Sequence, residues 1–186
     1  MRDSSLSHYE NLWDTMRIED AHLADIQFAA KIIARYMGEL YVPAQARTGV
    51  PWPMFGLTHL RECSCDPNAQ IVNGENWRHR TTLFPPGLGP WASWAESAIE
   101  CAKRMKWTTV TAWSVPVLLA ELEQHNGLGY AARGKESPYL WSFSQHGRGV
   151  GKFVADGHYD PGAVDRQPGC APVLKCLMDW GKWTTT

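Results

Sequence analysis

Residues 58–77 read THLRECSCDPNAQIVNGENW, and within them a helical pattern gives way to turn-forming residues. Four side chains between residues 54 and 61 fall near one helix face, which predicts a helix over this segment: Met54, Leu57, Thr58 and Arg61. Pro51 suits the first turn of that helix, because its missing N–H would have no helical partner there. The helix should end at residues 62–66, and the Asn-Gly pair at 73–74 is a turn signal. This stretch therefore predicts a mainly helical chain with a non-helical insertion.

The rest of the chain also shows mostly helical patterns. A capping box at Ser93 starts a helix, and Ser114 starts another that stops at Asn126-Gly127. A break is expected at Val42-Pro43, and the glycine-rich C-terminal third should form only short helices. The expected helices cover residues 9–16, 23–37, 51–62, a segment from Ser93, residues 114–126 and a segment near 172–180.

Residues 63–91 are the expected non-helical segment. Trp77 to Leu83 has the composition of a short strand, and Pro85-Pro86-Gly87 is irregular. The predicted fold class is mainly α, of the α+β kind, with a small β-hairpin or loop lobe at residues 63–91. We expect a single domain over residues 1–186.

The composition disfavours several classes of protein. The 186 residues carry a net charge of −1 and are 44% hydrophobic, which is typical of a globular domain and not of a nucleic-acid-binding protein. No stretch approaches the roughly 20 apolar residues of a membrane span, and the N-terminus lacks the apolar core of a signal peptide. Five cysteines without such a signal favour reduced thiols. The ten tryptophans have flat faces that suit sugar rings.

The segment 58–77 contains residue types that suit three kinds of site. A zinc site would use His59, Glu62, Cys63 and Cys65, but their spacing is that of neither a zinc protease nor a zinc ribbon. A cysteine nucleophile at position 63 or 65 lacks a supporting local signature. Glu62 at a helix end is the third possibility, because the negative end of the helix dipole resists ionisation. Glycosidic cleavage requires such a protonated carboxyl. We expect neither a bound metal ion nor a cofactor.

Several motifs occur in an order that resembles an endolysin-like lysozyme family of phages and bacteria. That family shows H-x-x-E-S-S-x-D, N-G-D, R-T and V-P-x-G in this order. The resemblance covers most of the chain, from about Tyr9 to Cys170. The matching stretches are His59-x-x-Glu62-Cys-Ser-x-Asp66, Asn73-Gly74-Glu75, Arg80-Thr81, Pro85-Pro86-Gly87, EQHNGLGY at 123–130, SPYLWS at 137–142 and GKFVADG at 151–157.

The family is similar to goose-type lysozymes and lytic transglycosylases, which implies a lysozyme-like fold with the small lobe flanking a cleft. In that group a glutamate ends a helix and a second motif faces it, so the resemblance implies that Glu62 is the general acid and Asn126-Gly127 the opposing motif. Three positions depart from the pattern. Cys63 replaces a serine, His125 stands where a tyrosine is usual, and Glu75 replaces an aspartate.

The implied reaction is cleavage of the MurNAc–GlcNAc β-1,4 bond of peptidoglycan, as in a muramidase that lyses bacteria. Glu62 would protonate the leaving oxygen, and a second carboxylate, first Glu75 and then Asp66, would activate water. A lytic transglycosylase would need no such base, because the muramyl 6-hydroxyl attacks and forms a 1,6-anhydro product. A wall-binding module without turnover is the non-enzymatic alternative.

The resemblance also implies the residues that hold the glycan. Arg80 and Thr81 would bind an N-acetyl or lactyl group, or would pin the hairpin. Tyr130, Tyr139 and Trp141 would stack on sugars or would pack beneath the glycine-rich segment. The full expected set is His59, Arg80, Thr81, Gln124, His125, Asn126, Gly127, Tyr130, Tyr139 and Trp141.

The expected partner is the glycan strand of peptidoglycan, with neither nucleic-acid binding nor membrane insertion. The lack of a signal peptide fits a phage lysin that is made in the host cytoplasm and reaches the periplasmic wall with the help of a holin, and a prophage enzyme would look the same. We expect a monomer without a separate wall-binding domain, which suits a thin Gram-negative wall.

Overall fold

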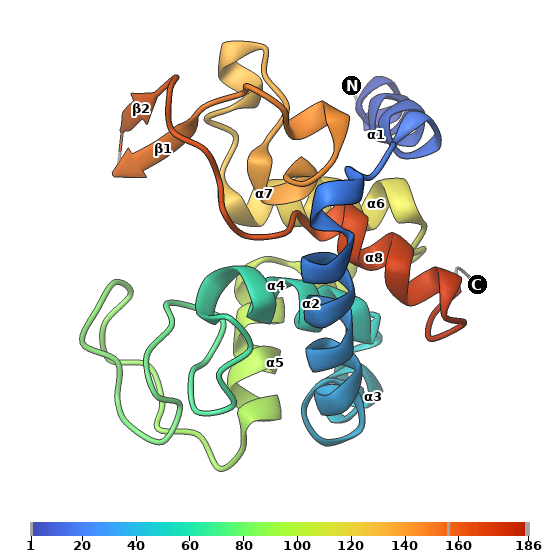
Figure 1. Cartoon of the computed structure of the whole chain (residues 1–186). Coiled ribbons are helices and arrows are strands. Elements are labelled where there is room, and N and C mark those ends of the chain that lie inside the picture. Colours follow the sequence, from blue (N-terminus) through green and yellow to red (C-terminus); the bar gives the residue numbers. More distant parts are fainter. Residues whose placement is uncertain (1, 156, 185–186) are drawn as a thin grey trace. The chain divides into compact units, whose positions relative to one another are not determined.

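The computed structural model describes residues 2–155 and 157–184 and is mainly helical, with one small antiparallel sheet (Figure 1). The chain forms two compact units. Unit 1 comprises Met1–Ala30 and Ser114–Thr186, and unit 2 comprises Lys31–Trp113. Helix α2, Leu23–Tyr36, begins in unit 1 and ends in unit 2. The predicted mainly α class is confirmed, but the small sheet lies at residues 152–160 and not in the lobe predicted at residues 63–91.

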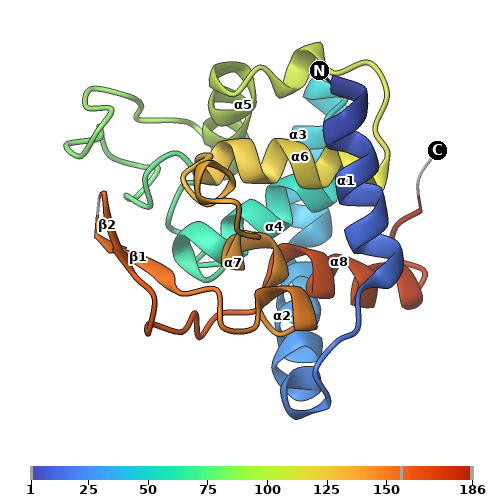
Figure 2. The ribbon, with the colours of Figure 1, turned by 90° about the horizontal axis from the view of Figure 1, so that it is seen from above.

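Unit 1 is built on the contact between its first helix and α6 (Figures 1 and 2). Strands β1 and β2 form a hairpin in which Phe153 pairs with Tyr159. The elements of unit 1 are α1 (Arg2–Thr15), η1 (Asp20–His22), the start of α2, α6 (Val115–Asn126), η4 (Ala131–Arg133), α7 (Pro138–Trp141), η5 (Gln145–Gly147), β1 (Lys152–Ala155), β2 (His158–Asp160) and α8 (Cys170–Asp179).

A buried polar pair joins α1 to α6. Tyr9 and Leu12 of α1 are buried, and the Tyr9 hydroxyl donates a hydrogen bond to the carboxyl group of Glu123. Glu123 is only 5% exposed, and desolvation by burial raises the pKa of its carboxyl. Because this carboxyl is enclosed in unit 1, it has little surface to offer a large substrate.

Unit 2 is arranged around the buried helix α4, Trp52–Cys63, in which the residues from Trp52 to Leu60 are all buried. Gly56 lets the helix pack closely, because a Cβ at this position would lie 2.7 Å from Ile33 Cγ2 and 3.2 Å from Tyr41 Cε2. The other elements are the end of α2, the π-helical turn η2 (Met37–Tyr41), α3 (Val42–Thr48), α5 (Trp94–Arg104) and η3 (Trp107–Thr109).

Local capping chemistry gives the helix ends that the sequence predicts. The Ser93 Oγ accepts a hydrogen bond from the N–H of Glu96 at 3.2 Å, at the start of α5. The Ser114 Oγ likewise accepts from the N–H of Val117 at 3.4 Å, and α6 ends before Gly127. Pro51 is the residue that precedes α4. These caps confirm the predicted helix boundaries.

Two local predictions are wrong. No break occurs at Val42-Pro43, because η2 leads directly into α3 and Pro43 occupies its first turn, where no helical N–H is needed. The strand predicted at Trp77 to Leu83 does not form. Residues 64–93 contain turns and one isolated bridge between Ala69 and Asn76, so the small lobe is a loop. The physical reason is that the N–H groups of Arg78, Thr82 and Leu83 bond the side chains of Asn76 and Glu75. Those of His79 and Thr81 bond loop carbonyls, so no partner strand is paired.

Among residues 2–155 and 157–184, no helix combines the length and the apolar character that a membrane crossing requires.

The packing at Gly56 gives a first prediction. Gly56→Ala should lower the free energy of unfolding by about 1–3 kcal/mol, because the new methyl group meets the stiff, buried side chain of Ile33. Gly38→Ala is the matched control, since a Cβ there meets no atom within 4 Å. Denaturant unfolding of both variants tests this. Equal stability of Gly56→Ala and the wild type would show that α4 is not closely packed.

Candidate active site

Glu62 lies in the last turn of α4 and its side chain is exposed. The helix stops because Ser64 and Cys65 adopt left-handed backbone conformations, with φ of 53° and 59°. The N–H groups of Ser64 and Cys65 then bond the carbonyls of Leu60 and His59, both at 3.0 Å. The predicted helix end at this glutamate is confirmed, and its carboxyl group is therefore near the negative end of the helix dipole.

The Asn73-Gly74 turn folds back onto this helix end. A Cβ built on Gly74 would lie 3.9 Å from the carbonyl oxygen of Glu62. Buried Gln70 holds the turn, since its Oε1 accepts hydrogen bonds from the N–H groups of Val72 and Asn73, at 2.5 and 3.3 Å. The Gln70 amide also donates to the Asn73 side chain. A buried amide thus fixes the turn that adjoins Glu62.

Glu75 binds the next part of the loop. Its carboxylate accepts hydrogen bonds from the Thr82 hydroxyl at 2.7 Å, from the Thr82 N–H at 3.0 Å and from the Leu83 N–H at 2.9 Å. The Asn73 Nδ2 donates to it as well, at 3.0 Å. These bonds, led by that of the Thr82 hydroxyl, hold the pKa of Glu75 below its usual value. Glu75 is therefore a loop anchor in this structure.

Arg80 and Thr81 close the neighbouring loop on itself. Thr81 is buried, and its hydroxyl donates to Pro85 O at 2.8 Å and accepts from the Leu88 N–H at 2.9 Å. The Arg80 guanidinium donates to Gly87 O at 3.0 Å. Of the two roles considered for this pair, the contacts support pinning of the loop.

His59 is fully buried, so it has no surface for the sugar contact that we expected of it. Its Nε2 lies 2.7 Å from Asp66 O, and since a carbonyl only accepts, Nε2 carries the proton and Nδ1 accepts from the Tyr41 hydroxyl at 3.0 Å. Burial lowers the pKa of His59 to about 4. The neutral ring ties α4 to the start of the loop and positions it.

The cysteines of this segment lack the character of nucleophiles. Burial, reinforced by nearby charges that include Glu62, raises the pKa of the Cys63 thiol. Burial also raises the pKa of Cys65, to about 12. All five cysteines are free, and no group of three or more His, Cys, Asp or Glu in the described part of the chain is arranged to hold a metal ion.

The remaining predicted substrate residues belong to unit 1. Tyr130, Tyr139 and Trp141 are 7%, 5% and 0% exposed, so their rings are packing residues and leave no face for a sugar. Tyr130 packs edge-on against Phe153, and its hydroxyl oxygen accepts a hydrogen bond from the Phe153 N–H at 3.0 Å. Among the residues at the end of α6, Gln124, Asn126 and Gly127 are exposed, His125 is half-buried, and the Asn126 amide donates to the Ser137 hydroxyl at 3.3 Å.

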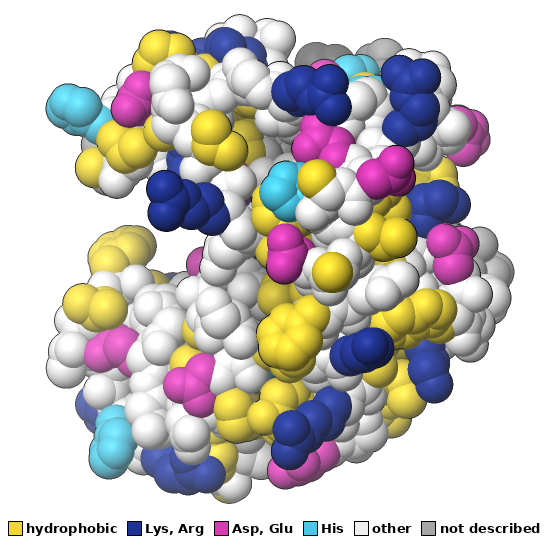
Figure 3. All heavy atoms as spheres, viewed as in Figure 1, with side chains coloured by type: hydrophobic (Ala, Val, Ile, Leu, Met, Phe, Trp, Pro, Cys, Tyr) yellow, Lys and Arg dark blue, Asp and Glu magenta, His cyan; other side chains and the backbone are white. Residues whose placement is uncertain are grey.

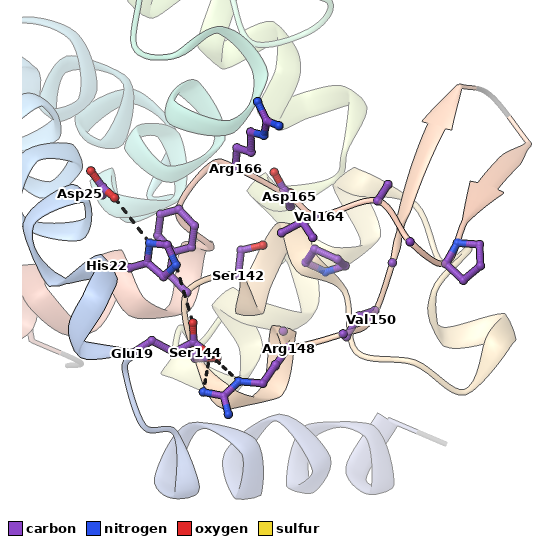
Figure 4. Close-up of a pocket in the computed structure, with 18 residues that line it drawn as sticks. Glu19, His22, Asp25, Ser142, Ser144, Arg148, Val150, Val164, Asp165 and Arg166 are labelled. Carbon is purple, nitrogen blue, oxygen red and sulfur yellow. Dashed lines mark hydrogen bonds and ion pairs between the residues drawn. The ribbon is translucent and has the colours of Figure 1, made fainter.

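Unit 1 also contains a pocket of about 520 Å³ that the sequence did not reveal (Figure 4). Its walls come from the η1–α2 start, with Glu19, His22 and Asp25, and from residues 138–151 and 161–166. The His22 ring stacks on Phe143 with centroids 3.9 Å apart. The glycine-rich run at 146–151 was the one visible signal, because glycines permit an irregular wall.

The acids of this pocket are mostly paired with cations. Glu19 binds Arg148 at 2.8 Å, as Figure 4 shows, and Asp165 binds the Lys152 ammonium group at 3.3 Å. Asp25 lies 3.6 Å from the His22 ring. Glu19 and Asp165 are already engaged in ion pairs with the protein's own side chains, which leaves them less available to a substrate. The pocket is thus a weaker candidate for glycosidic chemistry than Glu62.

Comparisons with models of protein families, with curated proteins and with solved structures gave no match to this chain.

The Glu75 contacts predict an acid-sensitive loop. The pKa of Glu75 is lower in the folded chain than its ordinary value of 4.5. The stability that its ionised carboxylate gives to the loop is therefore fully present above about pH 4.5 and is lost as the pH falls through the lowered pKa. Hydrogen exchange, corrected for intrinsic rates, should show weaker protection of the Thr82 and Leu83 amides in that acidic range. Glu75→Gln, which cannot ionise, should show no such step. Identical pH profiles for the two proteins would contradict the anchor role.

Proposed function

We propose that this chain is a peptidoglycan-cleaving muramidase with a lysozyme-like fold and with Glu62 as its general acid. The observation that carries the proposal is the position of Glu62. Its carboxyl is exposed in the last turn of a buried helix. The adjoining loop is held in place by side chains of the loop itself. The order of motifs that resembles the endolysin family supports the same assignment.

The chemistry follows from that position. The Glu62 carboxyl would give its proton to the glycosidic oxygen as positive charge develops at the sugar carbon. The carboxyl stands in the last turn of α4, where the partial negative charge of the helix end acts against a negative charge on the side chain. His59, Gln70 and Asn73 have structural contacts in this region, so their role is to keep helix and loop together around the acid.

The hydrogen bonds favour Asp66 over Glu75 as the carboxylate that would activate water. Both oxygens of Glu75 accept bonds from the loop. Asp66 is exposed, and its bonds from the N–H and the side-chain amide of Asn68, at 2.9 and 3.2 Å, both reach Oδ1. Neither of these two bonds uses Oδ2, whereas both oxygens of Glu75 are engaged, so Asp66 keeps more acceptor capacity for a water proton.

The engagement of Glu75 also favours a second candidate, a lytic transglycosylase. In that reaction the muramyl 6-hydroxyl attacks the sugar carbon, so the protein needs the acid at position 62 but no base for water. The two reactions give different products, because hydrolysis adds one water to the new reducing end and the anhydro product lacks it.

The proton donor can be tested directly. Glu62→Gln keeps the shape of the side chain and removes the proton, so release of muropeptides from purified sacculi should fall by about 10²–10⁴-fold. Glu39→Gln is the matched control, because Glu39 is an exposed carboxyl on η2, outside both α4 and the loop at residues 64–93. Full activity of Glu62→Gln would refute the assignment. Co-sedimentation of an inactive wild type with sacculi would instead indicate a binding module.

The second carboxylate can be tested by the products. If Asp66 activates water, Asp66→Asn should reduce the rate by about 10²-fold or more, and wild-type products should carry the added water in mass spectra. Anhydro products together with an active Asp66→Asn variant would identify the transglycosylase reaction.

A further inference from the structure

We propose that Phe84 is a sugar-stacking residue, held on a rigid loop beside Glu62, and that it binds the apolar face of a pyranose ring in the glycan strand. The inference rests on the proposed function for the identity of the ligand. It replaces the stacking role expected of Tyr130, Tyr139 and Trp141, whose rings are buried.

Phe84 is the most exposed large hydrophobic side chain in the described part of the chain. It is 90% exposed, and its neighbour Leu83 is 58% exposed. Figure 3, in the view of Figure 1, shows hydrophobic side chains exposed where this loop region projects from the helices of unit 2. An aromatic ring presented to solvent contributes little to the core, and its faces are open to a flat apolar ligand such as a sugar ring.

The loop that carries Phe84 is braced on both sides. Glu75 binds the N–H groups of Thr82 and Leu83 on the near side. On the far side, the Gly87 N–H bonds Thr81 O at 2.8 Å, and the Thr81 N–H bonds Leu88 O at 2.9 Å. Phe84 therefore loses little backbone freedom when it binds, which is the condition for an effective contact from one ring.

A chain of contacts joins this loop to the proposed acid. Gly74 adjoins the backbone of Glu62, and the Asn73 Nδ2 on the same turn donates to Leu83 O at 3.4 Å. A strand of sugars bound at Glu62 would thus have the Phe84 loop as its neighbouring surface in the same unit.

The chemistry of the loop favours a sugar over other occupants. Residues 81–88, TTLFPPGL, carry no charged side chain, and the guanidinium of the adjacent Arg80 is bonded to Gly87 O, whereas binding to an anionic membrane surface relies on basic residues that face it. Two exposed apolar side chains are also far less than the roughly 800 Å² per partner of a stable protein interface. One aromatic face matches one sugar ring.

The experiment separates binding from catalysis. Phe84→Ala and Phe84→Trp are made in the wild type and in Glu62→Gln, and the Glu62→Gln forms are titrated with purified sacculi and with the GlcNAc tetrasaccharide. Phe28→Ala is the matched control, since Phe28 is 65% exposed on α2. We expect Phe84→Ala to weaken binding about tenfold, Phe84→Trp to retain it and Phe28→Ala to leave it unchanged. In active protein Phe84→Ala should raise KM with little change in kcat.

Unchanged glycan binding of Phe84→Ala would overturn the inference. An equal loss of glycan binding in Phe28→Ala would also overturn it, because it would indicate non-specific adhesion. A change in self-association by gel filtration without a change in glycan binding would overturn it in favour of a second copy of the chain. Thermal unfolding should be the same for all variants, and Phe84→Trp keeps the test valid if the alanine variant unfolds. If the wild type releases no muropeptides but Phe84→Ala still weakens binding, the catalytic proposal fails and the role of Phe84 stands.

Discussion

The structure of the small lobe depends on the buried amide of Gln70. A buried amide that finds no hydrogen-bond partner costs about 1–3 kcal/mol, so its partners are strongly selected. Here those partners are the Val72 and Asn73 backbone and the Asn73 side chain. The Asn73 side chain in turn reaches Glu75 and Leu83. One buried group thereby organises a segment that has no regular sheet, and it does so directly beside the end of α4.

This way of building a lobe has a consequence for its chemistry. In a sheet the backbone satisfies itself, and carboxylates remain available for other tasks. In residues 64–93 backbone bonds form only turns and one isolated bridge, and side chains hold several of the remaining N–H groups; Glu75 accepts from those of Thr82 and Leu83. Bonds that stabilise a carboxylate also make it a weaker base. The residue that ranked first as a catalytic base from sequence is thus the one most occupied by structure.

Local signals predicted the starts of α5 and α6, because a cap such as Ser93 or Ser114 acts within one helical turn, but they placed a break at Val42-Pro43 where α3 begins. The same local reasoning missed the hairpin of β1 and β2, whose register shifts between Phe153 and Ala155 and disrupts the alternating pattern. It also could not separate exposed from buried aromatic residues. Trp141 is fully buried while Phe84 is almost fully exposed, and tertiary packing alone decides this. The pocket of unit 1 escaped notice since its walls lie more than a hundred residues apart in the chain.

The backbone at the end of α4 supports the choice of Glu62 on physical grounds that are independent of family resemblance. Ser64 and Cys65 are consecutive non-glycine residues with positive φ, a conformation that costs roughly 1–2 kcal/mol for each residue. A glycine at either position would relieve that cost. The surrounding contacts sustain it, because Cys65 is buried and its N–H bonds His59 O. Strain that is maintained in this way is concentrated at functional sites. Here it terminates the helix within two residues of Glu62, so the carboxyl stands at the helix end and the Asn73-Gly74 turn can lie against its backbone.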